Sequence, residues 1–102
     1  MIARIWHGVT SAARADAYVE FLKRTGVPDY KATDGNQGVY MLRRIEGDRV
    51  HFLMVTFWDA VESIQIFAGE DYEKARYYPE DTGFLLELEP NVAHYEVIDI
   101  PE

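Results

Sequence analysis

The sequence predicts a small α+β domain in which four antiparallel strands form one sheet and helices cover one face of it. Stretches rich in β-branched and aromatic residues alternate with stretches whose apolar residues have helical spacing. Their order is strand, helix, strand, strand, helix, strand, with short connections between them. The length of 102 residues fits one domain over the range 1–102.

The first half of the chain predicts a strand and a helix followed by a long loop. Residues 2–10 are β-branched and aromatic, and Ser11 is a suitable N-cap for a helix that runs to Arg24. Residues 26–38 contain proline, glycine and polar side chains, which are typical of a loop.

The middle of the chain predicts a hairpin and a second helix. Residues 38–45 and 49–58 have strand composition, and the turn between them is centred on a Gly-Asp pair. Asp59 is a candidate N-cap, and Glu62 three residues later completes a capping-box pattern. The apolar stripe of this helix ends at Ala68.

The last third of the chain predicts a broken helical region and a final strand. A second helical piece is expected over 72–78, where Pro79 stops it and begins a short turn that continues to Leu86. Residues 92–100 form the last predicted strand. The resulting βαββαβ order is the ferredoxin-like arrangement.

The predicted hairpin is apolar on both of its faces. Two helices cover one face only, and an antiparallel sheet normally has a polar face where it meets water. A second copy of the chain is therefore the expected cover, which predicts a homodimer. The alternative is that the final strand and the long loop cover this face within one chain. The face in question carries Tyr40, Leu42, Arg44, His51, Leu53, Val55 and Phe57.

Composition excludes several classes of function. The formal charge of −8 should repel phosphate backbones and anionic membrane surfaces, so neither nucleic acid nor membrane is an expected partner. No cysteine is present, which excludes disulfides and thiolate sites and is compatible with the cytoplasm. The histidines lack the spacing of a metal motif, and no glycine-rich phosphate loop precedes a helix.

Two polar residues within predicted strands are candidates for chemistry. His7 is able to act as a general base near neutral pH, or it is a hydrogen-bonded structural histidine. Arg43 lies among apolar neighbours and needs a carboxylate partner, solvent or a ligand anion.

Aromatic residues supply the other candidates. Trp58 ends a strand, where it either stacks on a planar substrate or fills the core. Tyr77 and Tyr78 precede a proline in a broken segment, where they either orient a substrate at a pocket rim or pack as an aromatic pair.

Four segments resemble the antibiotic biosynthesis monooxygenase superfamily, the dimeric α+β barrel proteins, and the resemblance covers nearly the whole chain. The segments are His7-Gly8-Val9-Thr10, Asp34-Gly35-Asn36-Gln37-Gly38, Val55-Thr56-Phe57-Trp58-Asp59-Ala60 and His94-Tyr95-Glu96-Val97. The resemblance implies a four-stranded sheet that pairs with a second sheet to form a dimeric barrel.

The resemblance also identifies site positions. The positions of the Asn, Trp and His that form the site of the haem-degrading branch are occupied here by His7, Phe67 and Tyr77, which speaks against haem degradation. In the quinone-forming branch an Asn and a Trp four residues apart on the third strand contact the substrate. Here Trp58 matches and Met54 replaces the Asn.

Three hypotheses follow from the residues and the resemblance together. The first is a monooxygenase that needs no cofactor and acts on a small aromatic or polyketide-like substrate. His7 would be the base, Arg43 would stabilise the anion, and Trp58 with Tyr77 would hold the ring. Phe67, Tyr78 and Met54 would line the substrate pocket. The second is a dimeric module that binds a small apolar ligand or haem without chemistry, and the third is a dimer without a ligand.

Overall fold

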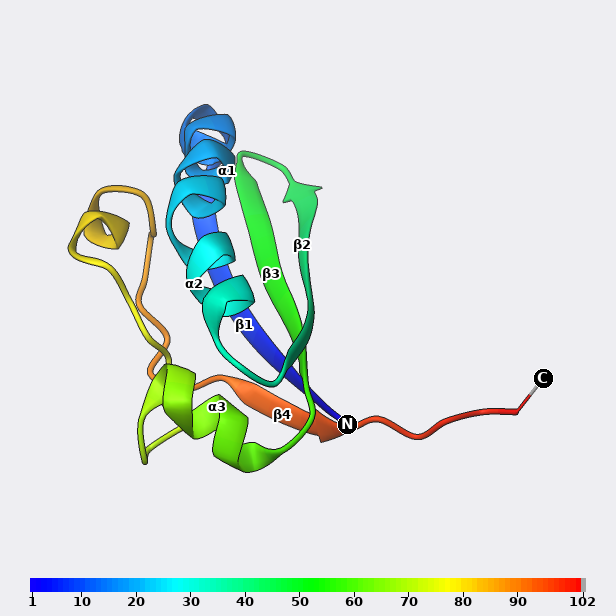
Figure 1. Ribbon diagram of the computed structural model, residues 1–102. Helices are drawn as coiled ribbons and strands as arrows, with labels where there is room; N and C mark the ends of the chain where they lie inside the picture. The colour runs from blue at the N-terminus through cyan, green and yellow to red at the C-terminus, as the bar shows by residue number, and fades with distance from the viewer. Residues whose placement is uncertain (102) are drawn as a thin grey trace.

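The structure, a computed structural model, describes residues 1–101 and has the predicted α+β architecture. Four strands form one antiparallel sheet in the order β2-β3-β1-β4, as Figure 1 shows. The strands are β1 (Ile2–Ser11), β2 (Asn36–Glu46), β3 (Arg49–Trp58) and β4 (Ala93–Glu96). The ferredoxin-like fold class is thereby confirmed.

The predicted hairpin connects β2 to β3. Gly47 has a φ of 61°, a value that a residue without a Cβ adopts at little cost, and it allows the two-residue turn. In the resulting register Met41 pairs with Met54 and Arg43 with Phe52, which confirms the two faces predicted for the hairpin.

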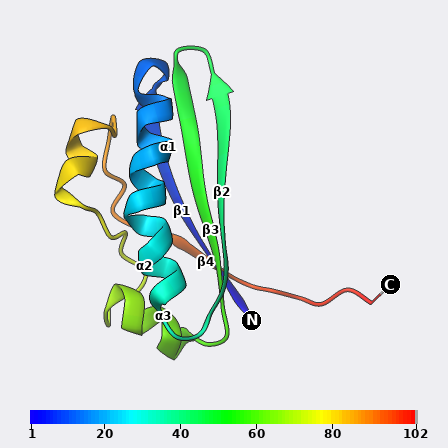
Figure 2. The same ribbon diagram turned by 45° about the horizontal axis from the view of Figure 1, so that its top comes forward.

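The helices lie together on one side of the sheet, as Figure 2 shows. A 3-10 turn (η1, Ala12–Arg14) leads into α1 (Ala15–Arg24), and α2 (Gly26–Ala32) follows. Helix α3 (Val61–Ala68) comes after β3, and a second 3-10 turn (η2, Pro79–Gly83) lies within the segment that returns to β4.

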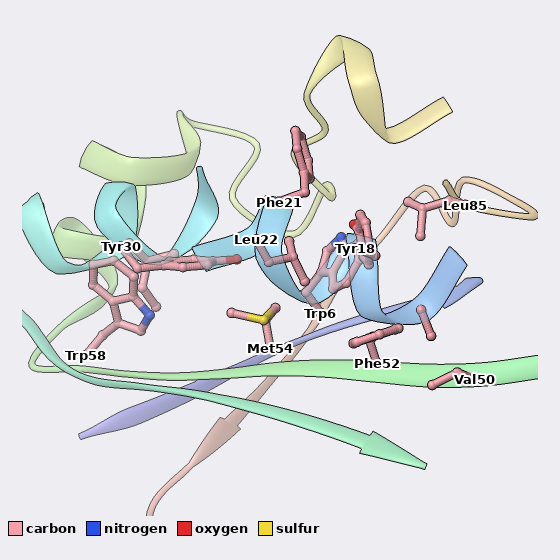
Figure 3. Close-up of a cluster of buried hydrophobic side chains, with 12 residues drawn as sticks. Trp6, Tyr18, Phe21, Leu22, Tyr30, Val50, Phe52, Met54, Trp58 and Leu85 are labelled. Atoms are coloured by element: carbon pink, nitrogen blue, oxygen red, sulfur yellow. The ribbon is translucent and has the colours of Figure 1, made fainter. Parts of the chain in front are cut away.

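The core lies between the sheet and these helices and is largely aromatic (Figure 3). Trp6 from β1 and Met54 from β3 are neighbours in the register and point toward α1. The ring of Trp6 lies over Gly8, where an added Cβ would come within 2.4 Å of a ring carbon. Glycine at this strand position therefore makes room for the large indole.

Three predicted elements and two predicted helix caps differ from the structure. Residues 26–38 contain α2, because Pro28 falls in a first helical turn, where the missing N–H does no harm. Residues 72–78 are not helical: the Ala75 N–H donates to Pro90 O and the Val92 N–H donates to Glu73 O. The backbone of this segment therefore bonds to the chain just before β4 instead of to itself.

The final strand is shorter than predicted, and helix capping differs. Strand β4 ends at Glu96, whose partner Ile2 is the first residue of β1, and beyond this pair the Val97 N–H donates to Met1 O. Ala60 is the N-cap of α3, and the Asp59 carboxylate accepts from the Ser63 hydroxyl in place of the expected cap. Ser11 also makes no side-chain capping bond.

No helix within residues 1–101 has the length and apolar character required to cross a membrane.

Candidate functional site

A narrow cleft opens between the helices, the sheet and the segment around η2. The free space within it is about 20 Å³, roughly the room that one water needs. Its walls come from β1, α1, α2, β3, α3 and the 76–81 segment. The lining residues are Trp6, Tyr18, Leu22, Gly26, Tyr30, Met54, Phe67, Arg76, Tyr78 and Asp81.

Flat aromatic side chains dominate one end of the cleft. Tyr30 and Phe67 stack with their ring centroids 4.4 Å apart, and Trp58 lies 5.9 Å from Phe67. Figure 3 shows Tyr30 over Trp58, on the helix side of β3. These three rings come from α2, α3 and β3, so tertiary packing alone assembles the stack.

Two phenol–carboxylate pairs also border the cleft. The Tyr18 hydroxyl donates to Asp81 Oδ1 at 2.8 Å, and both side chains are buried. Burial is the main cause that raises the pKa of Tyr18 well above its usual range, and the charge of Asp81 raises this pKa further. The Tyr78 hydroxyl donates to Asp29 in the same way, and burial together with that bond raises the pKa of Tyr78. Both phenols therefore remain protonated donors.

Arg4 is the one buried cation beside this cleft in the described chain. It is 1% exposed, and its guanidinium donates to Tyr30 Oη at 3.3 Å and to Lys74 O at 3.5 Å. It also lies 5.3 Å from the centre of the Phe67 ring. Burial lowers the pKa of Arg4, an effect that Tyr30 partly offsets. Two residues that line the cleft thus contact Arg4 directly.

His94 lies next to Arg4 on the same face of the sheet. The two residues are partners in the β1–β4 ladder, and Tyr72 packs edge-on against the imidazole with ring centroids 5.1 Å apart. Neither ring nitrogen of His94 has a hydrogen-bond partner among residues 1–101. Burial, and then the charge of Arg4, lowers the pKa of His94. The ring is therefore neutral near pH 7, and neither of its nitrogens is engaged by another described residue.

Five of the seven residues predicted for the site belong to the core between the sheet and the helices. Met54, Phe67 and Tyr78 line the same cleft. Trp58 is fully buried beneath it, and its indole N–H donates to Thr56 Oγ1 at 2.9 Å. Tyr77 packs edge-on against Trp6 at 6.2 Å, at the other end of the core.

The structure does not bring His7 and Arg43 to this group. His7 pairs with Leu53 and points to the open face, because side chains alternate along β1 and Arg4 and Trp6 occupy the other side. Arg43 is exposed and forms an ion pair with Asp16 at 2.8 Å. The expected set of His7, Arg43, Trp58 and Tyr77 is therefore not one site, and Arg43 has the common carboxylate partner.

His7 belongs instead to a polar array on the open face. Its Nδ1 contacts the Glu89 carboxylate, and its Nε2 lies 3.0 Å from His51 Nδ1. His51 Nε2 in turn lies 3.3 Å from Glu46 Oε1. The two imidazoles lie edge to edge, since their centroids are 5.2 Å apart while the nitrogens are in contact. Among residues 1–101 no three such side chains gather to hold a metal.

Sequence reasoning missed the polar residues of the cleft. Arg4 alternates with Trp6 along β1, and this spacing alone could have placed Arg4 on the buried face. Tyr18 and Asp81 are 63 residues apart in the sequence, and no pattern of neighbouring residues predicts that they pair.

Comparisons with known proteins agree with this fold. The chain is similar to MhuD from Mycobacterium tuberculosis, a heme-degrader whose structure holds two hemes in its active site. The TM-score is 0.56 at 21% identity, over 99% of this chain and 100% of that one. A point mutant of MhuD with two manganese protoporphyrin IX molecules per active site matches with a TM-score of 0.61 at 20% identity, over the whole of both chains. No protein-family model and no curated protein matches.

The structural similarity shows a common fold, and sequence identity near one fifth does not carry the activity of one chain over to the other. The match extends over the full length of this chain. The chain therefore shares the α+β fold of MhuD, which agrees with the fold that the sequence resemblance predicts.

Proposed function

We propose that the protein is a monooxygenase that needs no cofactor and oxidises a small aromatic substrate held in the cleft between sheet and helices. The observation that carries the proposal is the aromatic lining of this cleft. Tyr30, Phe67 and Tyr78 come from separate segments and present flat surfaces and phenol groups to one space. Such a lining, apolar with a few polar groups, is typical of a small-molecule site.

Binding requires the outer wall to move, since the present space holds no aromatic ring. That wall is the irregular segment 69–92, which carries Tyr78 and Asp81. Outside η2 it is tied to the rest of the chain by a few backbone bonds, such as Leu86 N to Val9 O. Segments with few backbone bonds open at low free-energy cost and often admit substrates.

The proposed chemistry begins with loss of a phenol proton from the substrate. His94 is the imidazole on the substrate side of the sheet, and as a neutral ring with an unused nitrogen lone pair it is the group that takes that proton. The electron-rich ring then reacts with dioxygen, which is the oxidant. One oxygen atom enters the ring as a new carbonyl and the other leaves as water. A phenol and dioxygen give a quinone and water, so no external reductant is needed.

Oxygen uptake with 1-naphthol, together with detection of the quinone, tests the proposal. We expect His94→Gln to lower turnover by about 100-fold or more, the usual size of a general-base effect. His51→Gln, a histidine change on the opposite face, is the matched control and should retain full turnover. Loss of activity in His7→Gln but not in His94→Gln would return the role of base to His7. Absence of any uptake by the wild-type protein refutes the oxygenase proposal.

Binding without chemistry is the second candidate function. It is favoured by one observation: no histidine is among the residues that line the cleft itself. A ligand that shifts the thermal unfolding midpoint without oxygen uptake would support this function. Haem does not fit the present cleft, because a porphyrin is several times larger than a single aromatic ring and the free space is close to that of one water.

We also propose that the protein is a homodimer paired through the open face of the sheet. Tyr40 and Leu42 of β2 are 59% and 47% exposed, and Tyr95 of β4 is 57% exposed, which is unusual for large apolar side chains on one face. Leu53→Glu places a charge at the centre of this face. Light scattering should show the mass fall from twice the chain mass of 11.8 kDa to that mass. A wild-type protein of single-chain mass contradicts the dimer.

A further inference from the structure

Arg4 is a buried cation with no anionic partner in the part of the chain that is described. A guanidinium stays charged at every physiological pH. The acceptors of Arg4 are both neutral, the Tyr30 hydroxyl and the Lys74 carbonyl, at the long distances of 3.3 and 3.5 Å. No carboxylate within residues 1–101 comes within ion-pair distance of it. Its Nε also lacks a partner there.

This arrangement is costly, because a buried charge is normally paired. Carboxylates are not scarce, since the chain has eighteen Asp and Glu residues and a formal charge of −8. A nearby charge has the same sign: the guanidinium of Arg76 lies 4.8 Å from the centre of the Phe67 ring that Arg4 also contacts. Arg76 itself is close to Asp29, at 3.8 Å, and so has a partner.

We propose that Arg4 is the counter-ion of an oxyanion, a carboxylate or a phenolate, on the aromatic ligand of the cleft. This inference rests on the proposed function, since it assumes that an aromatic ring enters the cleft. Tyr30 and Phe67 line the cleft and both contact Arg4, so a ring that packs beside this stacked pair is able to direct a substituent at the guanidinium. The oxyanion takes the place of the Tyr30 hydroxyl as the acceptor.

The neighbourhood of Arg4 suits an anion in a second respect. His94, its partner in the ladder, has two unpartnered ring nitrogens. A neutral imidazole N–H beside the guanidinium gives the oxyanion a second donor. The outer oxygens of a carboxylate or phenolate accept several bonds, and charge-assisted bonds of this kind are about twice as strong as neutral ones.

A matched pair of ligands tests the charge alone. We would measure binding of 2-naphthoate and of its neutral isostere 2-naphthamide by calorimetry at pH 7.5. The wild-type protein should bind the naphthoate at least about tenfold more tightly, which corresponds to one charge-assisted hydrogen bond. Arg4→Met should abolish this preference, and Arg4→Lys should retain part of it, since Lys keeps the charge but not the planar fork.

Stability provides an independent readout. If Arg4 serves a ligand, Arg4→Met removes an unpaired buried charge and should raise the thermal midpoint of the ligand-free protein. If Arg4 is structural, held by Tyr30 and the Phe67 ring, the same change should lower it. Arg49→Met, at an exposed arginine at the start of β3, controls for the change in net charge.

The outcomes separate the two proposals. Equal or tighter binding of 2-naphthamide overturns the role of Arg4 while an aromatic site remains. Should neither compound bind at millimolar concentration, the aromatic cleft fails and the role of Arg4 fails with it. A naphthoate preference that persists in Arg4→Met would place the anion elsewhere and also overturn the inference.

Discussion

The two faces of the sheet are built from the same strands but have opposite characters. On the helix side, β3 presents Phe52, Met54 and Trp58, which are at most 2% exposed. On the open side, the alternate positions Leu53 and Phe57 remain half-buried. The difference follows from the two-residue period of a strand combined with helices that cover only one side.

The comparison shows where chemistry is able to reside in this fold. Polar groups on the open face, such as His7 and His51, satisfy one another and flanking carboxylates. Polar groups on the covered face, Arg4 and His94, are left with unpartnered nitrogens. A buried polar group without a hydrogen-bond partner costs free energy, so the unpartnered nitrogens of Arg4 and His94 point to a ligand. The histidines of the open face already have partners.

The largest expected contrast between the faces is in stability. Trp58→Ala should cost about 3–5 kcal/mol of unfolding free energy, because it empties a fully buried site and leaves Thr56 without its indole donor. The neighbouring Phe57→Ala, on the open face, should cost about 1 kcal/mol in the monomeric protein. Urea denaturation measures both, and equal losses would mean that the open face is as well packed as the core.

A smaller contrast concerns two tyrosines. Tyr18→Phe removes the buried donor to Asp81, and we expect a loss of about 1–2 kcal/mol, since the carboxylate remains buried with one fewer partner. Tyr40→Phe, an exposed tyrosine of the open face, should change stability by less than about 0.5 kcal/mol. Thermal unfolding of both variants and the wild type measures the two losses of stability. A neutral Tyr18→Phe would contradict the pairing.

The pH dependence of stability distinguishes His94. Its pKa is lowered in the folded chain, so below about pH 6.5 the unfolded state takes up a proton that the folded state refuses. Stability should therefore fall as the pH drops through this range. Urea midpoints at pH 7.5 and 5.5 should differ less in His94→Gln than in the wild type. Identical differences would show that His94 does not titrate in this way.

The smallest expected effect is that of Arg43. Its ion pair with Asp16 is exposed, and such pairs contribute little, so Arg43→Gln should cost less than about 0.5 kcal/mol. The same variant should bind 2-naphthoate as the wild type does, in contrast to Arg4→Met. Calorimetry measures the affinity of both arginine variants for 2-naphthoate. Weaker binding by Arg43→Gln than by the wild type would restore a ligand role to Arg43.

Local patterns in the sequence predicted much of the fold. The Gly-Asp turn set the register of the hairpin, and strand alternation placed Met54 and Trp58 on one face correctly. The same rule, applied from β1 to β3, would have separated His7 from Trp58. Without the β1–β3 register, however, the sequence did not say which face of β1 meets the helices.

The sequence by itself determined the order of strands and helices, the hairpin and the aromatic character of the core, because these depend on residues close together in the chain. The tertiary structure decided the site. It joined Tyr18 to Asp81, stacked Tyr30 on Phe67, turned His7 outward and buried Arg4 without a carboxylate. Such contacts depend on segments that meet only after folding, and their energies come from burial and pairing that a linear pattern does not record.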